Sequence, residues 1–344
     1  MKVLFTGSTA KQVDDLAWSR ARVKRIDDST IVCESLRKQG YEVDRRKIKW
    51  GDDLSQYDMA IVGVGCFGSN NYSGDIFNSL YALDQVKNVV VFYEDWKITS
   101  NMSSFLGMLK QGILEKAIEK KWSNGNHFYG GVDSEFFDIE VARKVLINLS
   151  KGHYDALIPA FDWGDKQIVR DIIKSKNIYN IDLTPYVLDN WNIDLRPKRQ
   201  EKKKGYMLAS LVDHSRWVKK FGFGWKTTYY GAKSIKDSIK LATETDVYDE
   251  CGKYWGVLCP EYPHAGSGWF RIRYIYSALQ RSILFMPYKD LKALGLEYKW
   301  LENLSEDELR EYANEQRKAI LKHSFDKETF DNKIKTIVDE ISNR

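Results

Sequence analysis

NVVVFYEDW, residues 88–96, is the stretch of sequence that decides the fold. Its continuous apolar run follows a Lys-Asn turn and is typical of a strand buried on both faces of a parallel sheet. Its charged residues, Glu94 and Asp95, lie at the carboxyl end. Because ligands bind at the carboxyl ends of strands in open α/β sheets, Asp95 is a candidate general base. The alternative is that the acidic pair only caps the next helix.

Strand and helix patterns alternate on both sides of this stretch. Before it we expect strands at 2–6, 41–47 and 57–64 and helices at 29–39 and 75–86. After it we expect helices at 103–120, 139–149 and 165–174, strands at 155–159 and 178–183, and a long exposed loop at 122–137 that contacts ligands. Alternation with short connections predicts a doubly wound parallel sheet. The first strand is not followed by GxGxxG, which disfavours a NAD or FAD enzyme.

A second series of the same kind follows a polar, basic segment at 189–204. It comprises expected strands at 206–211, 226–230, 256–259 and 282–287 and expected helices at 215–221, 234–241 and 269–280. The sequence therefore predicts an α/β protein of two Rossmann-like domains facing across a cleft. We expect a first domain at 1–188, a linker at 189–204 and a second domain at 205–325.

The carboxyl-terminal segment, 305–341, is expected to be helical throughout. Ser305 and Glu308 have the spacing of a capping box at its start. Its last helix carries an apolar stripe formed by Phe330, Ile334, Ile337 and Ile341. We expect the helix at 326–344 to pack back on the first domain, the alternative being the second domain.

Length and composition limit the class of protein. The chain has 344 residues, 43% of them hydrophobic and 29% charged, which is typical of a globular protein of two domains. The sequence has neither a long apolar run nor the pattern of a signal peptide, so we expect a cytoplasmic protein that does not bind membranes. Its four cysteines have no CxxC spacing and give no support to a metal site.

Charge and aromatic content favour an acidic, ring-bearing partner. The net charge is +5, and Arg20, Arg22 and Lys24 form a basic cluster beside Trp18. Such clusters bind nucleic acid in some proteins and are plain solvated surface in others. The 11 Trp and 20 Tyr exceed what a core needs, which indicates a groove where rings stack on sugars or bases.

Three segments resemble a known family. They are NVVVFYEDW at 88–96, GYMLASLVDHSRW at 205–217 with TTYYGA at 227–232, and WFRIRYIYSALQRSILF at 269–285. Their order and spacing are similar to those of the two-lobed (GT-B) glycosyltransferases, and among these to the DNA β-glucosyltransferases of T-even bacteriophages. The resemblance spans nearly the whole chain.

This resemblance implies roles for particular residues. Asp95 takes the place of the catalytic base, and Ser210, Arg216 and Arg273 take places that meet the donor diphosphate. The sequence also departs from the family. A third diphosphate arginine falls on Val212, and the glutamate that grips the donor ribose falls on Tyr276.

Further candidates lie on loops at the expected strand ends. For the donor they are His214, Glu261, His264, Gly266, Ser267 and Tyr276; for the acceptor, Phe67, Gly68, Asn70 and Trp96; for nucleic acid, Arg20, Arg22, Lys24 and His127. Arginine suits bidentate contacts to phosphate, and free amides at 266–268 before a helix suit the same anion. Each of these residues also has a plain interpretation as a turn, a surface ion pair or a hydrogen-bonded loop residue.

The resemblance implies an activity. We expect transfer of a sugar from a nucleoside diphosphate sugar, with UDP-glucose the nearest guess, to a hydroxylated base such as hydroxymethylcytosine in phage DNA. The base would be flipped out of the duplex, and a single displacement would invert the anomeric carbon. We expect no tightly bound cofactor, leave a divalent cation open, and expect a monomer in the cytoplasm of an infected bacterium. The alternatives are transfer to a cell-surface polymer or small molecule, and a nucleotide- or DNA-binding module without turnover.

Overall fold

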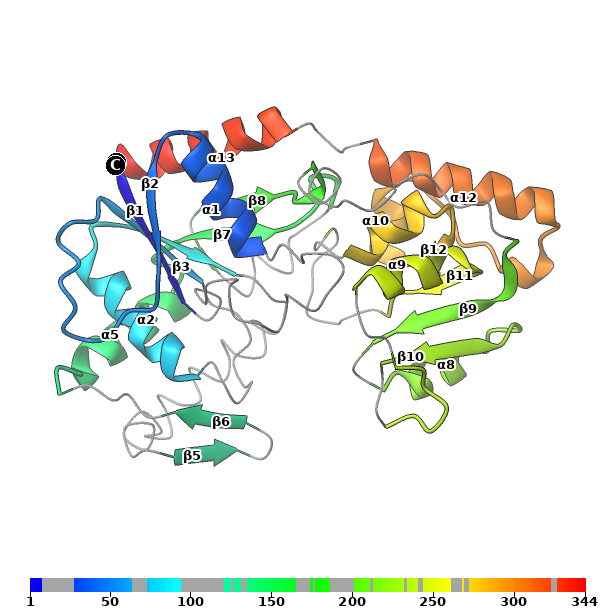
Figure 1. Ribbon diagram of the computed structural model, residues 1–344, viewed down its shortest axis with the longest axis horizontal. Coiled ribbons are helices and arrows are strands. Elements are labelled where there is room, and N and C mark those ends of the chain that lie inside the picture. Colours follow the sequence, from blue (N-terminus) through cyan, green and yellow to red (C-terminus); the bar gives the residue numbers. More distant parts are fainter. Residues whose placement is uncertain are drawn as a thin grey trace.

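Two parallel sheets form the two lobes of the molecule, seen side by side in the computed structural model (Figure 1). The structure describes residues 1–7, 28–63, 73–93, 121–124, 127–130, 135–164, 174–175, 177–185, 201–210, 213–231, 234–240, 244–260, 268, 272–322 and 327–344. The strands of the first sheet lie between residues 2 and 181, and those of the second between residues 203 and 285.

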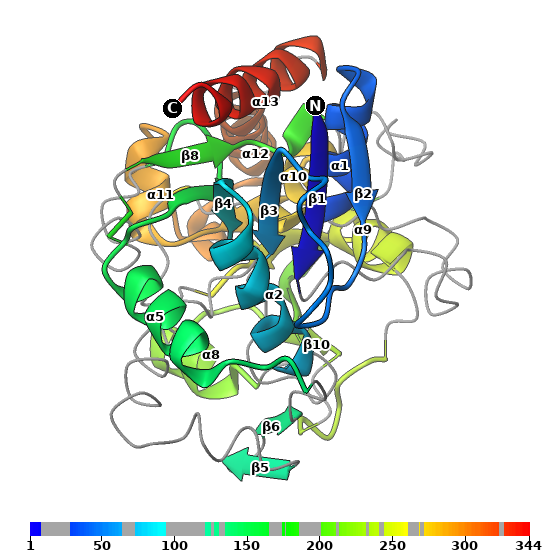
Figure 2. The same ribbon diagram turned by 90° about the vertical axis from the view of Figure 1, so that its left-hand side faces the viewer.

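The first sheet has six parallel strands in the order β2-β1-β3-β4-β7-β8 (Figure 2). They are β1 (Lys2–Gly7), β2 (Glu42–Arg45), β3 (Met59–Gly63), β4 (Asn88–Phe92), β7 (Asp155–Pro159) and β8 (Ile178–Ile181). β4 pairs with β3 on one side and with β7 on the other. Val90, Val91 and Phe92 are buried, so the prediction of a strand buried on both faces is confirmed.

Helices cover both faces of this sheet. α2 (Ser73–Gln85) and α5 (Ile139–Ser150) form one core with alternate strand residues such as Val91. α1 (Asp28–Lys38) and α13 (Lys327–Ser342) form the other core with the intervening residues such as Val90. Successive side chains along a strand point to opposite faces of the sheet, so neighbours such as Val90 and Val91 belong to different cores.

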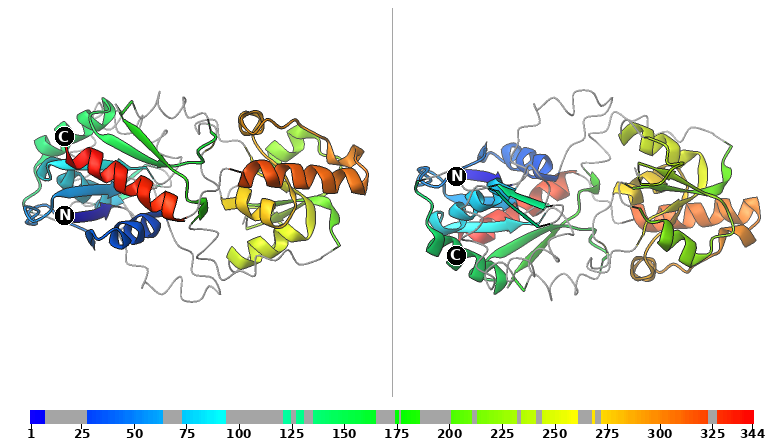
Figure 3. Two further views of the ribbon diagram at one scale, coloured as in Figure 1. Left: turned by 90° about the horizontal axis from the view of Figure 1, so that it is seen from above. Right: turned by 90° about the horizontal axis from the view of Figure 1, so that it is seen from below.

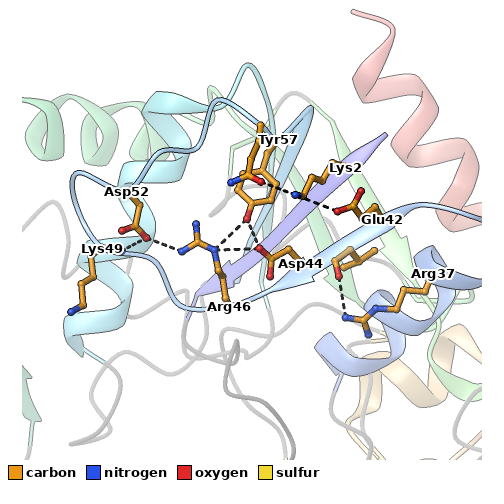
Figure 4. Close-up of polar contacts among 10 residues, drawn as sticks. Lys2, Arg37, Glu42, Asp44, Arg46, Lys49, Asp52 and Tyr57 are labelled. Carbon is orange, nitrogen blue, oxygen red and sulfur yellow. Dashed lines mark hydrogen bonds and ion pairs between the residues drawn. The ribbon is translucent and has the colours of Figure 1, made fainter.

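A polar network stabilises the edge of this sheet at β2 (Figure 4). The Arg46 guanidinium lies 3.3 Å from the Asp44 carboxylate and 2.8 Å from the Asp52 carboxylate. Its Nε also donates to the Tyr57 hydroxyl at 3.2 Å. These contacts tie the connection from β2 to β3 to the edge strand β2.

The second sheet has four parallel strands in the order β10-β9-β11-β12. They are β9 (Lys203–Ala209), β10 (Thr227–Tyr230), β11 (Tyr254–Leu258) and β12 (Ile283–Phe285). α9 (Glu244–Gly252), α10 (Ile272–Leu279) and α11 (Tyr288–Ala293) contribute to the core on one face, and α8 (Ser215–Phe221) and η1 (Leu301–Asn303) cover the other. α12 (Glu306–Leu321) contributes to both.

The sequence-based prediction is wrong in three places. No helix forms at 234–240, where Ile239 instead bridges to Tyr230, because this segment pairs with the edge strand β10. The expected loop at 122–137 contains the hairpin β5 (Lys121–Asn124) and β6 (His127–Gly130), whose strands are separated by Gly125 and Asn126, a common hairpin pair. β9 begins within the expected linker, because Lys203 pairs with Tyr254. The helices expected at 103–120 and 165–174 lie outside the described residues.

The last helices bind different lobes, as the view from above shows (Figure 3). The capping box that starts α12 is confirmed between Ser305 and Glu308. The apolar stripe of α13 is buried on the first sheet, with 2% to 5% of each side chain exposed. Asp331 anchors the helix to α1 by accepting from Ser35 Oγ and Lys38 Nζ, each at 2.6 Å. The last helix therefore completes a hydrophobic core of the first sheet.

Among the described residues, no helix is both long and apolar enough to cross a membrane.

Candidate functional site

The carboxyl edge of the second sheet brings together several of the residues predicted to bind the donor. β9 ends at Ala209, and the Ser210 N–H donates to the Tyr230 carbonyl at 2.9 Å. Asp213 accepts from the Ser215 N–H at 2.8 Å, which fixes the turn into α8. His214 immediately precedes α8, and Arg216 is its second residue. The turn between β9 and α8 thus places His214 and Arg216 at the edge of the sheet.

Arg273 enters the same site from α10. The helix begins at Ile272, so Arg273 lies in its first turn. Half-burial lowers the pKa of His214, and the Arg273 guanidinium lowers this pKa further, while Asp213 raises it. The Arg273 guanidinium therefore lies close enough to His214 for its charge to act on the imidazole. At neutral pH the site therefore holds a neutral imidazole beside permanent positive charge.

Tyr276 does not belong to this site. Its side chain is 0% exposed and its ring packs edge-on against Tyr248, with the ring centroids 5.5 Å apart. A side chain with no exposed surface cannot contact a nucleotide, so the prediction that Tyr276 binds the donor is wrong. Burial of a large aromatic residue in the core of the second lobe explains its presence.

The prediction of free amides at 266–268 is wrong at Gly268. Its N–H donates to Asp290 Oδ1 at 2.8 Å, and its carbonyl accepts from the Phe161 N–H at 2.7 Å. The amide of Gly268 is therefore not available to a phosphate. Gly266 and Ser267, together with Glu261 and His264, lie outside the described residues.

The same glycine joins the two lobes. Gly268 has a φ of 75°, and a Cβ at this position would lie 2.4 Å from Gly164 Cα. Phe161 stacks on Trp163 with centroids 5.0 Å apart, and both rings contact Tyr274 of α10. The segment after β7 thus packs directly against the helix that carries Arg273. Only glycine allows this approach of the two backbones.

The acceptor side of the predicted site lies mostly outside the described residues. This holds for Asp95 and Trp96, for Phe67, Gly68 and Asn70, and for Arg20, Arg22 and Lys24. His127 is the first residue of β6, and its side chain is not among those described. The ladder of β4 continues through Tyr93, whose N–H donates to the Leu157 carbonyl at 2.9 Å.

Two carboxylates at the edge of the first sheet were missed by the sequence-based prediction. Asp162 follows β7 and Asp182 follows β8. Burial raises the pKa of Asp182 from its ordinary value of 3.8 to about 6. Hydrogen bonds from Thr184 lower this pKa, and the negative charge of Asp162 raises it. Asp162 also accepts from Lys333 Nζ of α13 at 2.7 Å. Their signal in the sequence is the one that identified Asp95, an acid directly after an apolar strand.

Metal ligation finds no support in the described part of the chain. No group of three or more His, Cys, Asp or Glu side chains is placed there to hold an ion. Cys33, Cys251 and Cys259 are buried in the two lobes.

Comparison with known proteins identifies the fold. No protein-family model and no curated protein matches the sequence. The structure is similar to T4 phage BGT in complex with its UDP-glucose substrate, with a TM-score of 0.50 and 12% identity over 100% of this chain and 98% of that chain. This chain has the GT-B fold. The predicted fold class is thereby confirmed.

Two further structures show weaker similarity. T4 phage BGT in complex with UDP and Mn2+ is 13% identical over 100% of this chain and 95% of that chain, with a TM-score of 0.49. The glycosyltransferase SnogD from Streptomyces nogalater is 11% identical over 98% of this chain and 99% of that chain, with a TM-score of 0.38.

Proposed function

We propose that this GT-B protein is a glycosyltransferase that moves a sugar from a nucleoside diphosphate sugar to a hydroxylated base in DNA. The observation that carries the proposal is that His214 and Arg216 at the start of α8, and Arg273 in the first turn of α10, follow the carboxyl ends of β9 and β11, and that the Arg273 charge acts on His214. The donor's diphosphate is the group that leaves, and positive charge held in place before the reaction stabilises it. The fold supports the same assignment, because ligands of such sheets bind at this edge.

The donor half of the proposed site uses Arg216, Arg273, Ser210 and His214. The two guanidinium groups bind phosphate oxygens, for which their planar array of donors is suited. Ser210 lies at the end of β9, where a hydroxyl reaches an anion bound at the sheet edge. Gly266, Ser267, Glu261 and His264 remain proposed donor contacts. UDP-glucose is the proposed donor, since the protein of similar fold was crystallised with it.

The acceptor half uses the connections that follow β1, β3 and β4, which leave the same edge of the first sheet. Asp95, the third residue after β4, is the proposed base. It takes the proton of the acceptor hydroxyl, whose oxygen forms a bond to the anomeric carbon as the bond to the diphosphate breaks. One displacement of this kind inverts the anomeric carbon. Phe67, Gly68, Asn70 and Trp96 are proposed to hold the acceptor.

Duplex DNA with modified bases is the proposed partner. A base in a duplex must leave the stack before its hydroxyl can reach a buried donor. Arg20, Arg22 and Lys24, which follow β1, together with His127, are proposed to contact the nucleic acid. We further propose a monomer, acting in the cytoplasm of an infected bacterium, without a resident cofactor.

Transfer to defined DNA tests the proposal. With UDP-glucose as donor, we expect label to enter duplexes that contain hydroxymethylcytosine and not the unmodified duplex. Asp95→Asn should bind UDP normally and lose transfer, while the neighbouring Glu94→Gln is the matched control and should retain it. Parallel assays with EDTA and with Mn2+ determine whether a cation assists the leaving group.

Three results would contradict the proposal. Transfer only to small hydroxylated molecules or to a cell-surface polymer would replace the acceptor. UDP binding without any turnover would favour a binding module. Unchanged transfer by Asp95→Asn would remove the proposed base.

A further inference from the structure

Aromatic side chains gather on one outer face of the second lobe. Of the seven large hydrophobic residues exposed among those described, four are rings in this lobe: Phe221 (40% exposed), Tyr288 (63%), Tyr298 (38%) and Trp300 (46%). Phe223 and Phe285 connect them, since Phe223 contacts Phe221 and Trp300 and Phe285 contacts Tyr298. We call these six residues the aromatic face. A contiguous exposed apolar patch of this kind marks an interaction surface.

A groove opens beside the aromatic face, between α8 and β10. Its volume is about 480 Å3, and its walls include Ser215 and Lys219 of α8, Thr227 and Tyr229 of β10, and Phe223 and Trp225 of the connection between them. α8 has only seven residues and ends at Phe221, because the following Gly222 has a φ of 68°. The helix is therefore too short to cover β10 completely. Phe223 belongs to both the groove and the aromatic face, so the two form one surface.

The connection at 222–226 is held in place by Glu302. This carboxylate accepts from the Gly224 N–H at 2.8 Å, from the Trp225 N–H at 3.1 Å and from the Tyr206 hydroxyl at 2.9 Å. These bonds fix Phe223 and Trp225 where they line the groove. All three bonds end on the same carboxylate oxygen, Oε1. The groove is thus formed before any ligand arrives, which lowers the entropic cost of binding.

Positive charge borders the groove. Lys219, Lys220 and Lys226 are exposed, and within the described part of the chain none of them forms an ion pair. From residue 213 to residue 231 the sequence has a single acid, Asp213, whose carboxylate is bonded to the Ser215 N–H. The three lysines therefore present charge to an anion from outside the chain.

We propose that the groove and the aromatic face bind single-stranded nucleic acid. Unpaired bases stack on exposed rings, and a row of lysines beside them binds the phosphates. Bases of a duplex are already stacked and cannot use the rings. A neutral polysaccharide would use the rings and leave the lysines without a role. This surface carries no group for transfer, so the inference goes beyond the proposed function and does not depend on it.

Binding of labelled oligothymidylate tests this inference, without any sugar donor. Fluorescence anisotropy at 50 mM salt should show tighter binding of the single strand than of a duplex of equal length. Lys219→Glu/Lys220→Glu should weaken single-strand binding at least ~10-fold and make the salt slope shallower by roughly 1.4, since each lost contact contributes about 0.7. The matched control is Lys318→Glu/Lys322→Glu at the carboxyl end of α12, a helix at the opposite side of the second lobe from α8 (Figure 1). It should bind like the parent.

A second pair of variants separates stacking from charge. Phe221→Ala and Trp300→Ala should each weaken single-strand binding by roughly fivefold or more and leave the salt slope unchanged. Circular dichroism and the thermal midpoint of each variant show that it is folded. The inference is overturned by absence of single-strand binding at 50 mM salt, or by equal losses in the control on α12. It is also overturned if the lysine variant binds normally, or if the surface binds dextran or a second copy of the chain in place of the oligonucleotide.

Discussion

The outer faces of the two sheets are closed in different ways. On the first sheet, α1 and α13 cover one face, and Phe330 of α13 is 4% exposed. On the second sheet, the short α8 and a set of rings cover the corresponding area, and Phe221 of α8 is 40% exposed. The same strand geometry thus gives a sealed core where α1 and α13 cover the sheet, and an open aromatic surface beside the short α8, although α12 also contributes to that core. The difference separates residues that stabilise the fold from residues available for binding.

The largest expected effect tests this comparison directly. Phe330→Ala should lower the free energy of unfolding by about 3–5 kcal/mol, because it leaves a cavity in a closed core. Phe221→Ala should cost about 1 kcal/mol or less, because much of its ring already contacts water. Urea unfolding of both variants measures the two values. Equal losses would show that the second face is as closed as the first.

A smaller effect is expected for the polar anchors of the two faces. Asp331→Ala should cost about 2–3 kcal/mol, since it removes charged hydrogen bonds and leaves the buried Ser35 hydroxyl without this acceptor. Glu302→Ala should cost less and should speed amide hydrogen exchange at Gly224 and Trp225. Urea unfolding and exchange monitored by NMR provide the measurements. Slow exchange that persists in Glu302→Ala would mean that the groove does not depend on this carboxylate.

The carboxyl edges of the two sheets carry ionisable groups whose pKa values are shifted in opposite directions, Asp182 on the first sheet and His214 on the second. The folded-state pKa of Asp182 is raised to about 6, so the folded protein binds this proton more tightly than the unfolded chain. Between pH 3.8 and 6 this group therefore makes stability fall as the pH rises, and the penalty is complete above pH 6. Asp182→Asn should be more stable than the parent at pH 7.5 and lose that advantage towards pH 4. Thermal midpoints across this range measure the difference, and parallel curves for the two proteins would contradict it.

The smallest effect on binding or stability is expected at the edge of the second sheet, where the pKa of His214 is lowered. Burial and Arg273 lower the pKa of His214, so this group makes the fold less stable as the pH falls below its ordinary value of 6.5. A bound diphosphate favours the charged imidazole, so UDP should bind more tightly at pH 5.5 than at pH 8, by less than about tenfold. Calorimetry of the parent and of His214→Gln tests this expectation. A variant that keeps the pH dependence would exclude His214 as its source.

Local patterns in the sequence predicted most elements of both sheets. The apolar run at 88–93 identified the central strand β4, and the predicted helix at 215–221 has the bounds of α8. The predicted helix at 234–241 is wrong because Ile239 bridges to Tyr230 of the edge strand β10, a contact that helical periodicity does not reveal. In the candidate site, Ser210, Arg216 and Arg273 were predicted from the resemblance to the GT-B glycosyltransferases, and their roles stay a prediction. The burial of Tyr276 depends on how α9 and α10 pack, which spacing alone does not reveal.

The sequence by itself determined that the chain alternates strands with helices, that α12 begins with a capping box, and that the last helix has an apolar stripe. These features depend on neighbours within a few residues of one another. The tertiary structure decided that the stripe packs on the first sheet, that the Gly268 amide is occupied, and that the face beside α8 stays open. Periodicity shows that a surface is apolar, but which distant segment covers it depends on how the whole chain packs.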